Sequence, residues 1–371
     1  MTSSSDDPRA PAMLAGLRTL ARGHHLSTSA AAAIFREIMA GACEPAQIGG
    51  LLMALAIKGE TMGEISGAAE AMREAAIEVP TRRDPVIDTC GTGGSGIPRR
   101  NVSTATALAV AACGVTVAKH GNRAASSRSG SADVLEALGV DVAASPETVG
   151  RCIDEVGVGF LFARSLHPAM GHAGPVRAAL GVRTIFNLLG PLTNPARVRR
   201  QVLGVFDPRR CHDLARALGS LGSERVFVVH GFREGVPAGP GSPAGIDDLS
   251  PEGESLVVEW RDGELREHVL RRADFELPER PMAALAGGDP GQNAEALRRL
   301  LAGEGGGYRE AVMHAGALAL LVAGDEDLDR LPAASRRIAA VLDDGSAQRV
   351  LARLVEISGQ AGKVGSSQPP G

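Results

Sequence analysis

Strand-like runs that alternate with helical patterns constrain the fold of this chain more than any other feature. The runs lie at Val86–Asp88, Val115–Ala118, Val158–Phe162, Gln201–Val205 and Arg225–Val229. Helical stretches separate them, and the clearest are at 103–113 and 132–138. This alternation predicts an α/β fold with a central mixed, mostly parallel sheet flanked by helices. Because several of the runs lead into polar, glycine-rich segments, we expect a ligand site along one edge of the sheet.

The N-terminal part of the chain follows a different pattern. Residues 13–79 carry apolar residues at helical spacing and show no strand signal. Ser27–Ser29 are suited to cap a helix over 30–39, and further helical patterns follow at 46–57 and 65–76. We therefore predict a small all-helical N-terminal domain, completed by part of 173–200, and a larger α/β domain, with bounds at 13–84 and 85–358.

Three segments have compositions that do not favour regular structure. Residues 1–12 are polar, and residues 359–371 are rich in Gly, Ser and Pro, so we predict a disordered tail at each end. Residues 232–245 combine three prolines with several glycines, which predicts an irregular, mobile loop.

Composition excludes several classes of function. The net charge of −4 argues against a dedicated nucleic-acid-binding protein, which usually has a basic excess. Aromatic residues make up only 3% of the chain, so stacking platforms for bases are not expected. The five cysteines form no CxxC pair, and neither a signal peptide nor a membrane-spanning run is present. These features predict a soluble cytoplasmic protein with reduced thiols and no nucleic-acid or membrane partner.

The segment from Lys119 to Asp133 has the composition of a phosphate-binding loop. It combines cations, a histidine, an amide, serine hydroxyls and glycines, and then enters an amphipathic helical pattern. Buried polar groups cost free energy unless they are hydrogen-bonded, and an anionic ligand would supply the partners. Backbone N–H groups at a helix start, hydroxyls and a lysine together suit phosphate oxygens.

Two neighbouring segments extend this anion-binding pattern. Gly91–Gly96 follows a strand, and its glycines allow backbone N–H groups to approach an oxyanion closely. It matches neither a Walker A loop nor the dinucleotide fingerprint, and an ordinary tight turn is an equal alternative. Asn101–Thr104 stands at a helix start, where a simple N-cap is the alternative.

Candidate metal and carboxylate ligands occur later in the chain. Asp247 and Asp248 form an acid pair that suits Mg2+, although acid pairs on loops are usually only solvated. His167–Met170 and Arg177 precede the Gly- and Pro-rich segment 181–195, which predicts a bent connection between domains. Arg177 can hold a substrate carboxylate in a fork, and a surface arginine is the alternative.

Taken together, these motifs resemble the anthranilate phosphoribosyltransferase family of tryptophan biosynthesis. The resemblance covers about Leu14 to Leu354. It rests on Gln47–Met72, Gly91–Gly94, Asn101–Thr104, Lys119–Ser127, His167–Met170 and Thr184–Pro195. It implies a homodimeric enzyme, with a site between the two domains, that transfers the phosphoribosyl group of phosphoribosyl pyrophosphate (PRPP) to the amine of anthranilate. Positioning and electrostatics would dominate this catalysis, so no catalytic acid or base is assigned.

The resemblance also implies roles for individual residues. Two Mg2+ ions per active site are expected, on Ser103 and on the acid pair Asp247 and Asp248. Anthranilate would contact Gly91, His120, Asn122 and Arg177. PRPP would be held by Gly91, Gly94, Ser95, Arg99, Asn101, Ser103, Thr104, Lys119, Gly121, Asn122, Arg123, Ser126, Ser127 and Ser131.

This chain departs from the family pattern beside the pyrophosphate. Ser95 replaces an aspartate, Arg99 replaces a threonine, Arg100 replaces an apolar residue and Asp248 replaces a glutamate. Losing one acid and gaining two cations predicts a more positive PRPP side, with tight pyrophosphate binding and weaker Mg2+ dependence. Three alternatives stay open: a substituted anthranilate as acceptor, a pyrimidine nucleoside phosphorylase, and a non-enzymatic nucleic-acid-binding relative.

Overall fold

An eight-stranded sheet forms the centre of the computed structural model, which describes residues 11–124, 128–235 and 245–360. The strand order is β3-β2-β1-β4-β5-β7-β8, and β6 pairs with β5. Strands β1 to β5 run parallel, whereas β6, β7 and β8 are antiparallel to their neighbours. Their bounds are β1 Val86–Gly91, β2 Thr116–Gly121, β3 Val158–Phe162, β4 Arg200–Gly204, β5 Arg225–Phe232, β6 Gly245–Ile246, β7 Ser255–Arg261 and β8 Glu264–Leu270.

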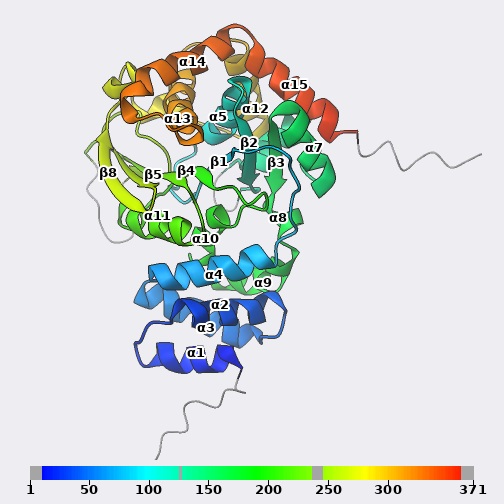
Figure 1. Ribbon diagram of the computed structural model, residues 1–371, viewed down its shortest axis with the longest axis vertical. Helices are drawn as coiled ribbons and strands as arrows, with labels where there is room; N and C mark the ends of the chain where they lie inside the picture. The colour runs from blue at the N-terminus through cyan, green and yellow to red at the C-terminus, as the bar shows by residue number, and fades with distance from the viewer. Residues whose placement is uncertain (1–10, 125–127, 236–244, 361–371) are drawn as a thin grey trace, which may run out of the picture.

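The N-terminal helices form a bundle at one end of the molecule (Figure 1, blue). Ser27 caps the second helix, and Thr61 with Glu64 forms a capping box on the fourth. Gly67 lets two of these helices approach closely, because a Cβ there would clash with the Thr28 carbonyl. The bundle comprises α1 Ala12–Ala21, α2 Thr28–Met39, α3 Pro45–Lys58 and α4 Met62–Glu74, and it is joined by α9 Gly174–Leu180.

The other helices cover the two faces of the sheet. One apolar cluster runs from the bundle through 185–192 and α11 to Val226 and Val228 of β5. A second cluster packs α5 and the C-terminal helices on Phe227 and Val229, which point to the opposite face. The remaining helices are α5 Val102–Ala112, α6 Ser131–Ala137, α7 Pro146–Val156, α8 Ala163–Leu166, α10 Phe186–Leu189, α11 Cys211–Ser220, α12 Pro290–Leu301, α13 Gly307–Ala323, α14 Leu331–Asp343 and α15 Ser346–Ser358.

The predicted fold class is confirmed, and the parallel strands lie where the sequence pattern placed them. The predicted strand 158–162 matches β3, and the others differ from β1, β2, β4 and β5 by a few residues at their ends. Helix α1 begins at Ala12, inside the predicted N-terminal tail. The segment 232–245 is not irregular at its ends, because Phe232 pairs with Gly245 between β5 and β6. Residues 1–10, 236–244 and 361–371 lie outside the described residues.

The antiparallel hairpin β7–β8 was not predicted from the sequence. Its two-residue turn is Asp262-Gly263, and both residues have positive φ, at 53° and 84°. Asp-Gly is a strong signal for this type of turn, so the sequence contained the information. The pattern was obscured because β8 is an edge strand whose residues are largely exposed and charged.

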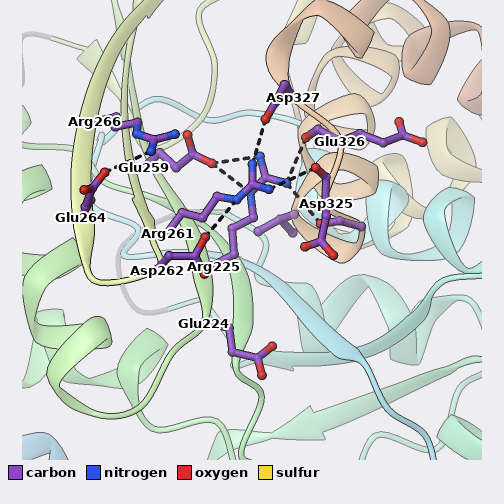
Figure 2. A network of polar contacts seen from close by, with 12 residues as sticks. Glu224, Arg225, Glu259, Arg261, Asp262, Glu264, Arg266, Asp325, Glu326 and Asp327 are labelled. Carbon is purple, nitrogen blue, oxygen red and sulfur yellow. Dashed lines mark hydrogen bonds and ion pairs between the residues drawn. The ribbon is translucent and has the colours of Figure 1, made fainter.

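A buried arginine joins the antiparallel end of the sheet to α13 (Figure 2). Arg225 of β5 is 2% exposed and donates to Glu259 of β7 at 2.9 Å. Its Nη1 also donates to the carbonyls of Leu321, Gly324 and Glu326 at 2.7–3.1 Å. A cation here satisfies carbonyls left free at the helix C-terminus. Within the described ranges, no helix has the length and apolar character needed to span a membrane.

Candidate active site at the carboxyl ends of the parallel strands

The strand order reverses between β1 and β4, so the carboxyl ends of these two strands form the switch point of the sheet. The chain proceeds from β1 through β2 to β3 on one side, and then returns to β4 and β5 on the other. Ligands of open α/β sheets bind at such a switch point, outside the carboxyl ends of the strands. Gly91 and Gly204 end β1 and β4 as register partners, and Asp247 packs against both. A Cβ on Gly91 would lie 2.7 Å from Asp247 Oδ2, so the Asp247 carboxylate would have to move if residue 91 carried a side chain.

The glycine-rich turn after β1 is tied to this switch point by hydrogen bonds. Gly93 N donates to Asp247 Oδ2 at 2.9 Å, and Thr92 N donates to Gly204 O at 2.9 Å. Gly94 has φ 97°, and its carbonyl accepts from the Arg183 guanidinium. The turn is therefore more than an ordinary tight turn, because it is hydrogen-bonded to Asp247 of the acid pair and to the distant Arg183.

Lys119 belongs to a buried polar cluster beneath the turn. Its side chain is 3% exposed, and Nζ donates to Thr89 O at 2.7 Å. Asp88, also buried, accepts from His120 N at 3.1 Å and from Asn194 Nδ2 at 2.9 Å. Burial lowers the pKa of Lys119 and the negative charge of Asp88 opposes this shift. Burial likewise raises the pKa of Asp88 against the attraction of Lys119.

Arg99 is bound to the acid pair. Its Nη2 lies 2.5 Å from Asp247 Oδ1, its Nη1 lies 3.7 Å from Asp248 Oδ2, and Nη2 also lies 3.4 Å from Ser95 Oγ. Burial raises the pKa of Asp248 to about 6, the Arg99 charge lowers it, and the neighbouring Asp247 raises it. Both predicted metal ligands of this loop thus already face a cation supplied by the protein.

The start of α5 is supported from the C-terminal part of the chain. Asn101 Oδ1 accepts from Asn293 Nδ2 at 2.9 Å, and Asn101 O accepts from the Tyr308 hydroxyl at 3.2 Å. Asn101 occupies the N-cap position of α5, but its side chain makes no capping bond to the helix. Ser103 is partly buried, and the buried Thr104 hydroxyl has no partner in the part of the chain that the structure describes.

The predicted phosphate loop after β2 is only partly directed at the site. Ser131 Oγ donates to Asn122 O at 3.3 Å, and a Cβ on Gly121 would clash with that hydroxyl. Arg123 instead pairs with Asp133 at 3.0 Å and Glu136 at 2.8 Å on the surface of α6. The structure therefore does not bring Arg123 to the phosphate site. The predicted ligands Ser126 and Ser127 lie outside the described residues.

Two buried imidazoles meet beside this loop. The His120 and His167 rings lie 5.2 Å apart, and His120 Nδ1 donates to Gly190 O at 3.0 Å. Neither Nε2 has a partner among the described residues. Burial lowers the pKa of His120 to about 3 and that of His167 to about 4, so both rings are neutral at pH 7.

The imidazole pair predicts a defined loss of stability in acid. Each unfolded histidine binds a proton near pH 6.5, whereas the folded pKa values are about 3 and about 4. Stability is therefore lost as the pH falls from 6.5 towards the folded pKa values, by up to about 1.4 kcal/mol per pH unit for each histidine. Urea unfolding at several pH values between 6.5 and 4 gives the free energy of unfolding as a function of pH. We expect this free energy to fall less steeply with decreasing pH in His167→Gln than in the wild type. The exposed His24→Gln is the control, and equal slopes for all three proteins would contradict the prediction.

Arg177 approaches from the helical side of the molecule. It lies on α9, which packs on α3, where Val176 faces Gly49. Its guanidinium lies 5.1 Å from the centroid of the Phe186 ring, and burial lowers its pKa. The Arg177 side chain is half-buried, and its role as a carboxylate ligand stays a prediction.

Several residues that position the site were not predicted from the sequence. Arg183 holds Gly94, Asn194 holds Asp88, and Asn293 with Tyr308 holds Asn101. Asn194 lies in the motif Thr184–Pro195, whereas no local sequence pattern identifies Asn293 or Tyr308 as part of the site. Among the described residues, no three or more His, Cys, Asp or Glu side chains are placed together to hold a metal ion.

Two family models together match most of the chain. The helical bundle domain of a glycosyl transferase family matches residues 16–76, and the a/b domain of a glycosyl transferase family matches residues 83–348. Fold and site thus define a glycosyl transferase with a helical bundle in front of an α/β domain.

Individual relatives narrow this class. The anthranilate phosphoribosyltransferase of Phenylobacterium zucineum is 48% identical over 92% of this chain and 97% of its own length. The crystal structure of the Thermus thermophilus enzyme of that name is 46% identical, has a TM-score of 0.84, and is matched over 92% of this chain and 99% of the other. The chain belongs to the anthranilate phosphoribosyltransferase family. A Saccharomyces cerevisiae structure in complex with PRPP and Mg shares the fold, with a TM-score of 0.83, 23% identity and coverage of 96% and 99%.

Proposed function

We propose that this protein transfers the phosphoribosyl group of PRPP to the amine of anthranilate in tryptophan biosynthesis. The anthranilate nitrogen bonds to the anomeric carbon of ribose, the bond from that carbon to pyrophosphate breaks, and the amine loses a proton. The observation that carries the proposal is the convergence of the glycine turn and the acid pair at the β1–β4 switch point. There, Gly93 N donates to Asp247 at 2.9 Å.

The PRPP side of the site consists of polar groups held at fixed positions. Developing oxocarbenium charge and a departing pyrophosphate are stabilised by groups that need no rearrangement. The buried Lys119 has donors left besides the one used by Thr89 O. The Thr104 hydroxyl, which has no partner among the described residues, lies near the start of α5. We assign PRPP to Gly91, Gly94, Ser95, Asn101, Ser103, Thr104, Lys119, Gly121, Asn122 and Ser131.

The residues that we assign to anthranilate, the acceptor, come from two parts of the fold. Asn122 follows β2 of the sheet, whereas Arg177 comes from α9 beside the bundle. Arg177 presents a planar fork that matches the anthranilate carboxylate. We also assign His120 to this side, because a neutral imidazole adds no positive charge beside the developing oxocarbenium. Its Nε2 is a hydrogen-bond acceptor that the described protein does not satisfy.

We infer that the reaction uses Mg2+. A group of phosphate oxygens with one or two protein oxygens is typical of magnesium sites, which fits the lack of a larger ligand cluster among the described residues. Ser103, partly buried near the start of α5, would hold the ion together with pyrophosphate oxygens. Bound there, Mg2+ neutralises part of the charge of the departing pyrophosphate.

We further propose a cytoplasmic homodimer with a helical domain over 13–84 and an α/β domain over 85–358. The exposed apolar side chains of the bundle support an interface there, since Ile57 on α3 is 80% exposed. Light scattering of the purified protein measures the subunit number directly.

Loss of anthranilate fluorescence in the presence of PRPP and Mg2+ tests the proposed reaction. We expect turnover, with equal amounts of pyrophosphate and of N-(5-phosphoribosyl)anthranilate detected by mass spectrometry. Uridine with inorganic phosphate tests for nucleoside phosphorylase activity and is expected to be inert. An absence of turnover with anthranilate and with substituted anthranilates would overturn the assignment.

A further inference from the structure

The acid pair of this chain is held by an arginine from a distant segment. Arg99 Nη2 lies 2.5 Å from Asp247 Oδ1, and the side chains of Arg99 and Asp247 are each only 12% exposed. Arg99 Nη1 lies 3.7 Å from Asp248 Oδ2. One guanidinium therefore faces both carboxylates in a poorly hydrated part of the site.

The backbone holds Arg99 in this position. Arg99 forms an isolated antiparallel bridge with Ala286, and Arg100 N donates to Leu285 O at 2.9 Å. Asn293 Nδ2 approaches Arg99 O at 3.4 Å, and Ser95 Oγ lies 3.4 Å from the guanidinium. Residues 285, 286 and 293 thus hold the backbone around Arg99, and Ser95 lies beside its guanidinium. The position of Arg99 is therefore fixed by the fold as well as by its charge.

Arg99 and a divalent ion would compete for the same oxygens. Two adjacent carboxylates out of water need a compensating cation, because like charges at short range disfavour joint ionisation. Mg2+ demands nearly ideal octahedral geometry at about 2.0–2.1 Å from its ligand oxygens. Since Arg99 already donates to Asp247 Oδ1, the acid pair does not fit Mg2+ in this arrangement.

We propose that Arg99 is a resident cation that takes the place of a divalent ion at Asp247 and Asp248. It is a positioning residue: it neutralises the pair and thereby holds Asp247 as the acceptor for Gly93 N in the glycine turn. Its buried Nε–H has no partner among the described residues, which leaves one donor for an acceptor outside them. The inference deepens the proposed function, because it limits the site to one divalent ion where two were expected from the sequence.

Mn2+ binding to the ligand-free protein tests this role without any turnover. Mn2+ is a paramagnetic substitute for Mg2+, and free Mn2+ is counted by electron paramagnetic resonance. We expect Arg99→Thr to bind one Mn2+ at least ten-fold more tightly than the wild type. The double variant R99T/D247N is expected to lose this site.

Arg100→Thr is the matched control. Arg100 adjoins Arg99, but its guanidinium lies 5.3 Å from the Tyr308 ring centroid and forms no ion pair in the described part of the chain. We expect its Mn2+ binding to equal that of the wild type. Arg99→Gln, with circular dichroism on every variant, replaces Arg99→Thr if the latter does not fold.

Equal Mn2+ binding by the wild type and the folded Arg99 variants, whether tight or absent, would overturn the proposal. A gain of binding in R100T equal to that in R99T would overturn it as well. A wild type that failed to consume anthranilate would refute the proposed function instead, and the Mn2+ titration would still decide the role of Arg99.

Discussion

Replacing Arg225 with methionine is expected to lower the free energy of unfolding by about 3–5 kcal/mol. The change leaves Glu259 buried without its cation and removes donors from the carbonyls of Leu321, Gly324 and Glu326. The penalty is large because an unpaired buried charge costs more than the ion pair contributes. Urea unfolding followed by circular dichroism measures it.

Arg266→Met provides the control for this prediction. Arg266 on β8 pairs with Glu264, and the two side chains are 53% and 68% exposed (Figure 2). Exposed pairs contribute about 0–1 kcal/mol, so only a small change is expected. A double variant, R225M/E259L, should recover part of the lost stability because no unpaired charge remains. Equal effects of R225M and R266M would show that the buried network does not stabilise the sheet.

Replacing Arg177 with alanine is expected to lower kcat/KM for anthranilate by about 10- to 150-fold. Hydrogen bonds to charged groups contribute about 1.5–3 kcal/mol, which corresponds to this range. The effect should fall on anthranilate, because Arg177 lies on α9 whereas the PRPP residues follow the strands and begin α5. Initial rates with each substrate varied in turn give the two constants separately.

Two further variants define the reason for that loss. Arg177→Lys keeps the charge but not the planar fork, and its activity is expected to lie between those of R177A and the wild type. Arg216→Ala removes an exposed arginine from another helix, α11, and should leave both constants unchanged. A loss in R177A that affects PRPP alone would contradict the assignment of Arg177 to the acceptor carboxylate.

Local sequence pattern was sufficient for the five parallel strands and for helices such as α2 and α5, whereas the helices from α12 to α15 were not predicted individually. The parallel strands are short runs with buried side chains, such as Val158–Phe162, and some helices begin at a recognisable capping residue, as α2 does at Ser27. The hairpin β7–β8 was missed although Asp262-Gly263 signals its turn, because charged residues on the exposed edge strand hide the alternation. The order of the strands is not local information, since it depends on which crossovers pack together.

Some residues of the candidate site could likewise be predicted from local sequence, and others could not. Glycines, hydroxyls and acids within one short segment are visible in the sequence, because their chemistry does not depend on distant residues. Arg123 carried the same local signal, yet it pairs with Asp133 and Glu136 on the surface of α6. The side chains that support Asn101 come from residues 293 and 308, which no local pattern connects to it.

By itself, the sequence predicted a phosphate-bearing ligand, from a glycine turn and a phosphate loop placed directly after short strands. Only the tertiary structure decided how the charges of the site are balanced. Arg99 and Asp247 are 148 residues apart in the chain, and the fold brings their side chains to 2.5 Å beside the ends of β1 and β4. Burial at the same edge also holds His120 and His167 neutral. Both effects depend on the order of the strands and on the exclusion of water when distant segments pack together. Neither can be predicted from the sequence of one segment alone.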